Sequence, residues 1–93
     1  MRESEIERKL RIEIKKINGM CLKFVPMHHV GFPDRICLLP KGICVFVELK
    51  SPNKKPKKIQ IWVHNSLRKM GFDVLIIDSL EKIKRFIEKY KNA

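Results

Sequence analysis

The sequence predicts an α/β fold in which a mixed central sheet of about four strands is flanked by helices, in the order α-β-β-β-α-β-α. Three observations support this. Apolar residues recur at helical spacing near both ends of the chain and after residue 56, β-type runs broken by Pro and Gly fill residues 20–50, and a short apolar run occupies residues 74–77. A chain of 93 residues can build one modest core, so we expect a single domain over residues 1–93.

The first expected element is a helix over residues 3–17, which a short strand over residues 20–25 follows. The helix has a stripe of apolar residues at helical spacing, namely Ile6, Leu10, Ile14 and Ile17. Asn18-Gly19 supplies the left-handed stop that commonly ends a helix, and Pro26 closes the strand.

Residues 34–39 and 43–50 form the next two expected strands, joined by Pro40-Lys41-Gly42. Three-residue hairpin loops often place glycine in the left-handed position, which Gly42 can adopt. If the strands pair antiparallel about Lys41, opposed residue numbers sum to 82, and Asp34 lies directly across from Glu48. A glycine bulge at the turn would shift this register by one residue.

The second helix is expected after a basic loop over residues 51–58, with Pro56 in its first turn and Gly71 at its stop. Gln60 and His64 fall on a flank of this helix. Its expected buried stripe consists of Ile59, Trp62, Val63, Leu67 and Met70. At this spacing we interpret Trp62 as a core residue and not as a platform for base stacking.

A fourth strand over residues 74–77 and a third helix complete the expected fold. Asp78-Ser-Leu-Glu81 resembles a capping box with Asp78 as the cap. The third helix is expected to bury Leu80, Ile83, Phe86, Ile87 and Tyr90.

The composition favours a polyanion as partner. Lys and Arg number 21 against 10 acidic residues, which gives a formal charge of +11. The basic residues are spread along the chain and do not form one amphipathic helix, so nucleic acid is favoured over a membrane surface. The alternative is a basic surface without a partner. No apolar run of about 18 residues exists and the N-terminus is too charged for a signal peptide, so we expect the cytoplasm of a bacterium or of a phage-infected host cell.

The cysteines Cys21, Cys37 and Cys44 are odd in number and have no C-x-x-C spacing. We therefore expect them to be small core residues in a reducing compartment. A zinc site that combines one of them with His28 or His29 is the less favoured alternative.

The central chemical feature is the expected pairing of Asp34 with Glu48. Like charges directly opposed in a sheet are destabilising unless something neutralises them, and a divalent cation held by carboxylates would do so. Lys50 lies two residues after Glu48 and shares its face, where an ammonium could orient a water or stabilise charge on a phosphate. The alternative is a simple ion pair of Lys50 at the end of the sheet.

These residues resemble a nuclease signature. Pro33-Asp34, then 13 residues, then Glu48-Leu49-Lys50 is similar to the PD-(D/E)xK motif. The wider context includes Lys23-Phe24, Gly31-Phe-Pro-Asp-Arg35, Val45-Phe-Val-Glu-Leu-Lys50, Gln60 and Gly71-Phe-Asp-Val74. It resembles the VRR-NUC branch, the virus-type replication-repair nucleases, over nearly the whole chain.

The resemblance implies a restriction-endonuclease-like core and a Mg²⁺ or Mn²⁺ cofactor. It implies Asp34, Glu48 and the Leu49 carbonyl as metal ligands, Lys50 as the catalytic lysine and Gln60 as a residue facing the site. It also implies a glutamate from the first helix. Glu3 lies inside the apolar stripe at 100° per residue and is the first choice, with Glu7 on a flank as the alternative.

The resemblance further implies a homodimer that cleaves branched DNA such as Holliday junctions or flaps. We expect the DNA to be contacted by Lys23, His29, Arg35, Lys54, Lys55, Lys57 and Lys58. The loop residues Met27-His28-His29-Val30 replace the small and basic residues expected there, and both loop surface and phosphate contact remain open for the two histidines. The rival function is a catalytically silent DNA-binding module that kept the fold and charge.

Overall fold

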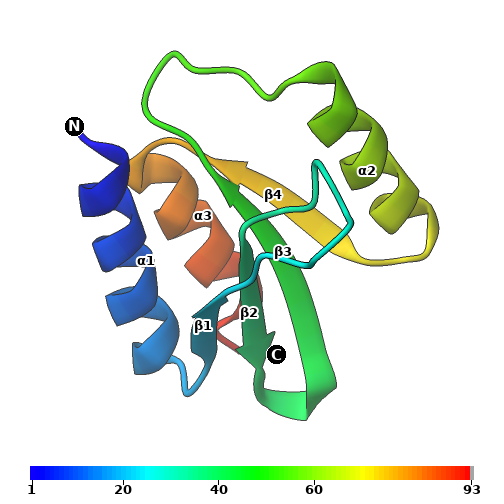
Figure 1. Cartoon of the computed structure of the whole chain (residues 1–93). Coiled ribbons are helices and arrows are strands. Elements are labelled where there is room, and N and C mark those ends of the chain that lie inside the picture. Colours follow the sequence, from blue (N-terminus) through cyan, green and yellow to red (C-terminus); the bar gives the residue numbers. More distant parts are fainter. Residues whose placement is uncertain (93) are drawn as a thin grey trace.

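The order of helices and strands matches the sequence prediction and confirms the expected α/β class (Figure 1). The structure is a computed structural model that describes residues 1–92. Its elements are α1 (Glu3–Lys16), β1 (Met20–Lys23), β2 (Arg35–Leu39), the 3₁₀ turn η1 (Pro40–Gly42), β3 (Ile43–Leu49), α2 (Lys58–Lys69), β4 (Asp73–Ile77) and α3 (Leu80–Tyr90). No helix within residues 1–92 is both long enough and apolar enough to cross a membrane.

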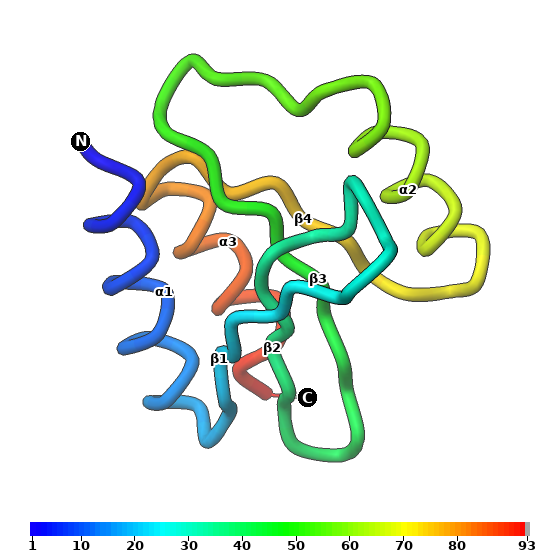
Figure 2. The backbone as a smooth tube through the Cα atoms, in the orientation of Figure 1, coloured from blue at the N-terminus to red at the C-terminus, as the bar shows by residue number. Residues whose placement is uncertain are grey.

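The four strands form one mixed sheet in the order β1-β2-β3-β4. The first three are an antiparallel meander, and β4 returns parallel to β3 after the α2 crossover. Helices α1 and α3 lie together on one side of the sheet and α2 lies on the other (Figure 1). The tube in Figure 2 shows the long segment after β3 arching over the end of the sheet before it enters α2.

The predicted hairpin register is confirmed. Arg35 pairs with Val47 and Leu39 pairs with Ile43, so the opposed numbers sum to 82 and no bulge shifts the strands. Gly42 has the expected left-handed backbone (φ 74°), and Lys41 before it is left-handed too (φ 68°).

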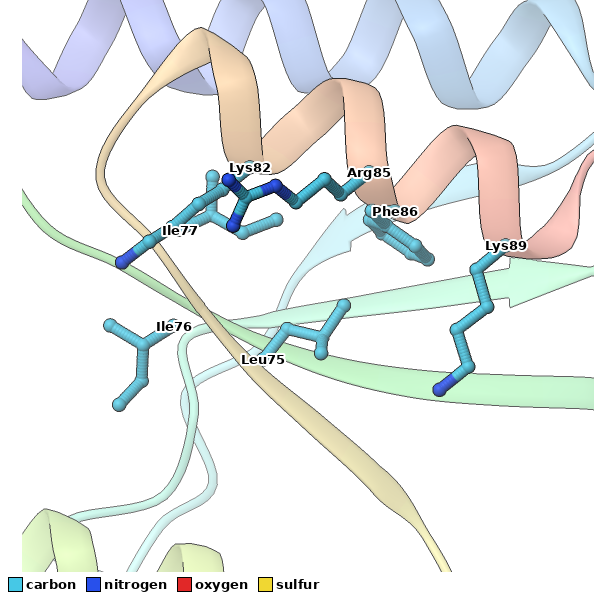
Figure 3. Close-up of a pocket in the computed structure, with 7 residues that line it drawn as sticks. All are labelled: Leu75, Ile76, Ile77, Lys82, Arg85, Phe86 and Lys89. Atoms are coloured by element: carbon cyan, nitrogen blue, oxygen red, sulfur yellow. The ribbon is translucent and has the colours of Figure 1, made fainter.

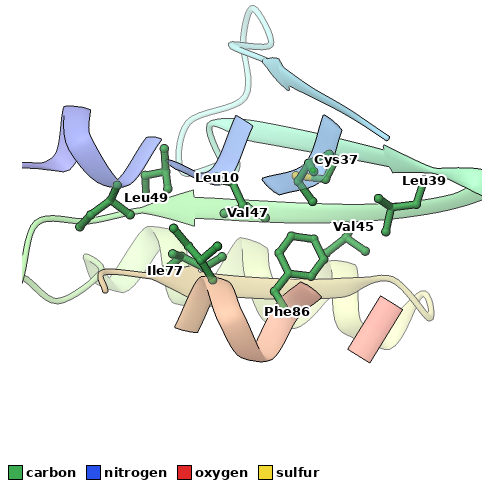
Figure 4. Packing of buried hydrophobic residues seen from close by; sticks show 11 residues of the cluster. Leu10, Cys37, Leu39, Val45, Val47, Leu49, Ile77 and Phe86 are labelled. Atoms are coloured by element: carbon green, nitrogen blue, oxygen red, sulfur yellow. The ribbon is translucent and has the colours of Figure 1, made fainter. Parts of the chain in front are cut away.

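Strand β3 divides its side chains between two apolar clusters. The larger cluster lies under α1 and α3, where Leu10, Val47, Leu49, Ile77 and Phe86 pack together (Figure 4). The smaller cluster lies under α2 and is built from Phe46, Leu67 and Val74, with half-buried neighbours around them. Alternate residues of a strand face opposite sides of the sheet, so Glu48 follows Phe46 onto the α2 side.

The orientation of α2 differs from the prediction. Ile59, Trp62 and Met70 are 44%, 68% and 69% exposed, whereas His64 and Leu67 are buried. Pro56 precedes the helix, because Lys57 is the cap residue and the helix begins at Lys58. The expected stripe is therefore confirmed for Leu67 and for the half-buried Val63, and it is wrong for Ile59, Trp62 and Met70, because the helix is turned so that Gln60 and His64 face the buried Glu48 on β3.

Two details of α3 also differ. Leu80 is 42% exposed and does not join the core. The cap is Ser79 and not Asp78, because the Ser79 hydroxyl accepts a hydrogen bond from the Lys82 backbone N–H at 3.2 Å. Asp78 instead forms an ion pair with the Lys82 ammonium at 3.0 Å.

The loop between β1 and β2 is held against the α2 side of the sheet. A row of edge-to-face ring contacts, with centroids 5.3 to 5.4 Å apart, joins Phe24, Phe32, Phe46 and Phe72. Gly31 in this loop has φ +86°, and a Cβ there would lie 2.9 Å from the backbone oxygen of Ile59. The close approach to α2 therefore requires glycine, and it fixes the path of the chain into Asp34.

Candidate active site

Asp34 and Glu48 lie where the ends of β2 and β3 meet. Asp34 immediately precedes β2, and the confirmed register continued by one residue sets it across from Glu48. The Asp34 backbone carbonyl accepts from Phe24 N–H at 2.9 Å, and its Oδ1 accepts from Leu49 N–H at 3.1 Å. Oδ1 of Asp34 is thus fixed to the backbone of β3. The other carboxylate oxygen, Oδ2, lies 3.6 Å from Arg35 Nη1 in an ion pair.

Glu48 is a buried carboxylate with polar neighbours on one side. It is 5% exposed. Its Oε2 accepts a long hydrogen bond from Gln60 Nε2 at 3.4 Å and lies 3.6 Å from Lys50 Nζ. Its Oε1 is buried and has no hydrogen-bond partner among residues 1–92. A buried oxygen without a hydrogen-bond partner is costly in a core, and its lone pairs are available to a cation.

The surroundings of Glu48 favour its protonated form. Burial raises the pKa of Glu48 to about 7, and the negative charge of Asp34 adds to the effect, while Lys50 acts in the opposite direction. Carboxylates with such shifts are characteristic of functional sites. A negative charge on Glu48 beside that of Asp34 is therefore only partly compensated by Lys50.

Gln60 connects this carboxylate to the start of α2. Its Oε1 accepts from the Lys57 backbone N–H at 2.8 Å, and its Nε2 reaches Glu48. The side chain therefore caps the helix and holds Glu48 with its two ends. The structure thus places Gln60 beside Glu48.

His64 is a residue of this site that sequence reasoning did not select. It is fully buried one turn after Gln60, and its Nε2 lies 3.9 Å from Glu48 Oε1. Burial, Arg68 and Lys50 all lower the pKa of His64, so the ring is neutral near pH 7. The available signal was the four-residue spacing from Gln60, which places two residues on the same face of a helix.

The first helix contributes less to the site than expected. Glu3 is exposed at the first residue of α1, although its charge is still among the causes that raise the pKa of Glu48. Glu7 accepts a hydrogen bond from Arg11 Nε at 2.6 Å. Within residues 1–92 no three His, Cys, Asp or Glu side chains are grouped so that they alone could hold a metal ion.

The oxygen donors that the structure does bring together suit a hard divalent cation. Mg²⁺ is usually bound by one or two carboxylates and completes its shell with water and substrate phosphate. In the described part of the chain neither Asp34 Oδ2 nor Glu48 Oε1 has a hydrogen-bond partner. The residues present therefore fit such a cation through two carboxylates, with the Leu49 carbonyl nearby in sequence.

The expected DNA-contacting residues form two groups. Lys54, Lys55, Lys57 and Lys58 are exposed on the segment that arches from β3 to α2, and none has a carboxylate within 4 Å among residues 1–92. Lys23 is exposed at the end of β1, and Arg35 is nearly buried against Asp34. The first group is therefore free to meet phosphates, whereas Arg35 already has a role in holding Asp34.

The two loop histidines lie near Asp34. His28 and His29 line a hollow of about 360 Å³ that Asp34 also borders. Both are exposed, so loop surface and phosphate contact both remain open. The three cysteines are free thiols, and Cys37 is fully buried as expected of a core residue.

A separate hollow of about 210 Å³ lies between β4 and α3 (Figure 3). Figure 3 shows the basic side chains of α3 around an apolar floor from β4; the lining residues are Leu75, Ile76, Ile77, Lys82, Arg85, Phe86 and Lys89. Each of its three cations has a carboxylate within 4 Å. It contains none of the predicted site residues.

The chain is similar in sequence to a known protein and in structure to another. No family model matches the chain. A protein named "Putative nuclease p44", from Acyrthosiphon pisum secondary endosymbiont phage 1, is 42% identical over 79 residues, which cover 85% of each chain. A solved structure described as a VRR_NUC domain superposes with a TM-score of 0.87 at 29% identity, covering 95% of this chain and 96% of that one.

Proposed function

Because this chain belongs to the VRR-NUC family of nucleases, we propose that it is an endonuclease that uses Mg²⁺ or Mn²⁺ to hydrolyse DNA phosphodiester bonds. The observation that carries the proposal is the pairing of Asp34 with Glu48 at the strand ends, with Lys50 beside them. Two neighbouring carboxylates, one of them buried with a free oxygen, need a positive partner that the protein does not fully supply.

In this proposal Asp34, Glu48 and the Leu49 carbonyl hold the cation, with Glu3 as the third carboxylate and Glu7 as the alternative. A bound divalent cation would lower the pKa of a coordinated water and stabilise negative charge on the phosphate. The Lys50 ammonium lies 3.6 Å from Glu48 Oε2, and in this proposal it stabilises charge that develops on a phosphate oxygen held by the cation.

The substrate is proposed to be held by its backbone. The chain carries a net charge of +11, and Lys54, Lys55, Lys57 and Lys58 are exposed on a segment that Gln60 links to Glu48 through the Lys57 backbone. Contacts of this kind give affinity that depends on salt and not on base sequence. Lys23, His29 and Arg35 are proposed as further contacts.

We propose branched DNA, such as Holliday junctions or flaps, as the substrate and a homodimer as the active form. Two active centres would allow paired cuts at one junction. Exposed apolar side chains support the existence of an interface, and the most exposed are Val25, Met27, Val30, Trp62 and Met70.

The test is cleavage of a four-way junction, a flap and a linear duplex by wild type and Glu48→Gln, each with Mg²⁺, Mn²⁺ or EDTA. We expect cutting of the branched substrates by the wild type only, and only with metal. Cleavage in EDTA, or full activity of Glu48→Gln, would refute the mechanism. Salt-dependent binding without any cleavage would favour the silent DNA-binding module. Light scattering with mass determination tests the dimer.

A further inference from the structure

His64 has an environment that packing alone does not explain. The ring is fully buried, and neither Nδ1 nor Nε2 has a hydrogen-bond partner within residues 1–92. Leaving a buried polar atom without a partner costs about 1–3 kcal/mol, so an apolar residue of similar size would make the better filler. Glu48 Oε1 is likewise buried and without a partner, and it lies 3.9 Å from Nε2.

A small movement of the His64 or Glu48 side chain would let His64 Nε2 and Glu48 Oε1 form a hydrogen bond with each other. A hydrogen bond between nitrogen and oxygen needs a separation near 3 Å, about 1 Å less than the distance observed. A neutral imidazole carries one N–H donor and one acceptor nitrogen, and only the donor can face a carboxylate. A carboxylate oxygen has two lone pairs, so Oε1 can accept from His64 and still offer a lone pair to a cation.

Gln60 and His64 together address both oxygens of Glu48. Gln60 Nε2 meets Oε2 at 3.4 Å, and His64 Nε2 faces Oε1 from one turn further along α2. The terminal torsion of a glutamate is broad, so a single contact leaves the plane of the carboxylate free to rotate. Contacts to both oxygens would fix that plane.

We propose that His64 is a positioning residue for Glu48: its Nε2–H donates to Glu48 Oε1 and, with Gln60, sets the orientation in which Glu48 binds a divalent cation. The cation part of this inference rests on the proposed function. Groups that orient metal ligands from behind typically alter metal affinity by about 10- to 100-fold when they are removed.

The first test needs no metal. The nitrogen resonances of His64, recorded by long-range ¹H–¹⁵N correlation at pH 8 in EDTA, report which nitrogen carries the proton. We expect the Nε2–H tautomer. The Nδ1–H tautomer would overturn the proposal, because Nε2 would then face the carboxylate as an acceptor.

The second test is calorimetric titration of Mn²⁺ alone into wild type, His64→Leu and His64→Gln, without DNA. We expect His64→Leu to bind Mn²⁺ about 10- to 100-fold more weakly and His64→Gln, which keeps a donor, to recover most of the affinity. Urea unfolding in EDTA shows whether each variant is folded. Leu67→Val, which disturbs α2 away from Glu48, is the matched control and should bind Mn²⁺ as the wild type does.

The outcomes separate this inference from the proposed function. Wild-type Mn²⁺ affinity in His64→Leu, or equal loss in the Leu and Gln variants, would overturn the positioning role. A wild type that binds Mn²⁺ but cleaves no DNA would overturn the nuclease proposal and leave the role of His64 intact. A wild type that binds no Mn²⁺ would overturn the metal dependence, and the tautomer would then decide the contact between His64 and Glu48.

Discussion

Replacing Glu48 by Gln should stabilise the metal-free protein at pH 8 while removing its function. Burial raises the pKa of Glu48 from an ordinary value of 4.5 to about 7. Between these values the folded protein holds a proton that the unfolded chain has released, so the free energy of unfolding falls as the pH rises through this window. At about 1.4 kcal/mol for each pH unit, the loss for wild type amounts to roughly 3 kcal/mol.

The assay is urea unfolding of wild type and Glu48→Gln in EDTA at intervals from pH 4.5 to pH 8. The two proteins should have similar stability near pH 4.5, where Glu48 is neutral when folded, and Glu48→Gln should gain up to roughly 3 kcal/mol by pH 8. The lowered pKa of His64 makes the free energy of unfolding rise with pH below about pH 6.5. His64 is present in both proteins, so this contribution largely cancels in their difference.

Addition of Mn²⁺ should reverse the order of stability. A cation at 1,000 times its dissociation constant adds about 4.1 kcal/mol to the wild type, which exceeds the roughly 3 kcal/mol lost through burial of Glu48, and should add little to Glu48→Gln. If the stability difference between the two proteins stays constant from pH 4.5 to pH 8, the carboxyl of Glu48 does not carry the cost of burial that we assign to it.

Three further changes test other parts of the site. Lys50→Ala should slow single-turnover cleavage by at least about 100-fold while DNA affinity, measured by fluorescence anisotropy, stays within threefold; wild-type cleavage would exclude a catalytic role. Alanine at all four lysines in residues 54–58 should lower the slope of log affinity against log salt by up to about 3.6, whereas an unchanged slope would place the DNA elsewhere. Gly31→Ala should lose at least about 1 kcal/mol more stability in urea than Gly42→Ala, because both are left-handed but only Gly31 meets the backbone of Ile59; equal losses would contradict that contact.

The hairpin could be predicted from the sequence because two independent signals agree there. The alternation of Val45, Val47 and Leu49 fixes which face of β3 enters the larger core, and the length of the turn about Lys41 fixes the register. A shift by one residue would move Val45, Val47 and Leu49 out of the larger core to the α2 side of the sheet, so the position of Asp34 relative to Glu48 followed from local pattern alone.

The rotation of α2 could not be predicted in the same way. Helical periodicity assumes that the most apolar stripe faces inward, and on that assumption Trp62 and Met70 were expected in the core. In the structure Gln60 donates to the buried carboxylate of Glu48 and His64 is buried beside it, so these two residues face the sheet in place of Trp62 and Met70. Sequence periodicity contains no information about what the facing strand presents.

The same limit applies to the first helix. Phase along α1 put Glu3 in the apolar stripe, but a residue in the first turn lies beyond the edge of the packed layer and is exposed. The third carboxylate therefore depends on what approaches that end of the helix, which neither periodicity nor burial decides.

The double use of the Gln60 side chain has a thermodynamic consequence. One end of it binds the Lys57 backbone in the basic segment, and the other binds Glu48. Any ligand that orders the segment would then also restrict Glu48, and a cation on Glu48 would restrict the segment. The two ligands should be positively cooperative and, by reciprocity, each should raise the affinity of the other by the same factor. Such coupling would favour a complete metal site only when a phosphate backbone is already in place.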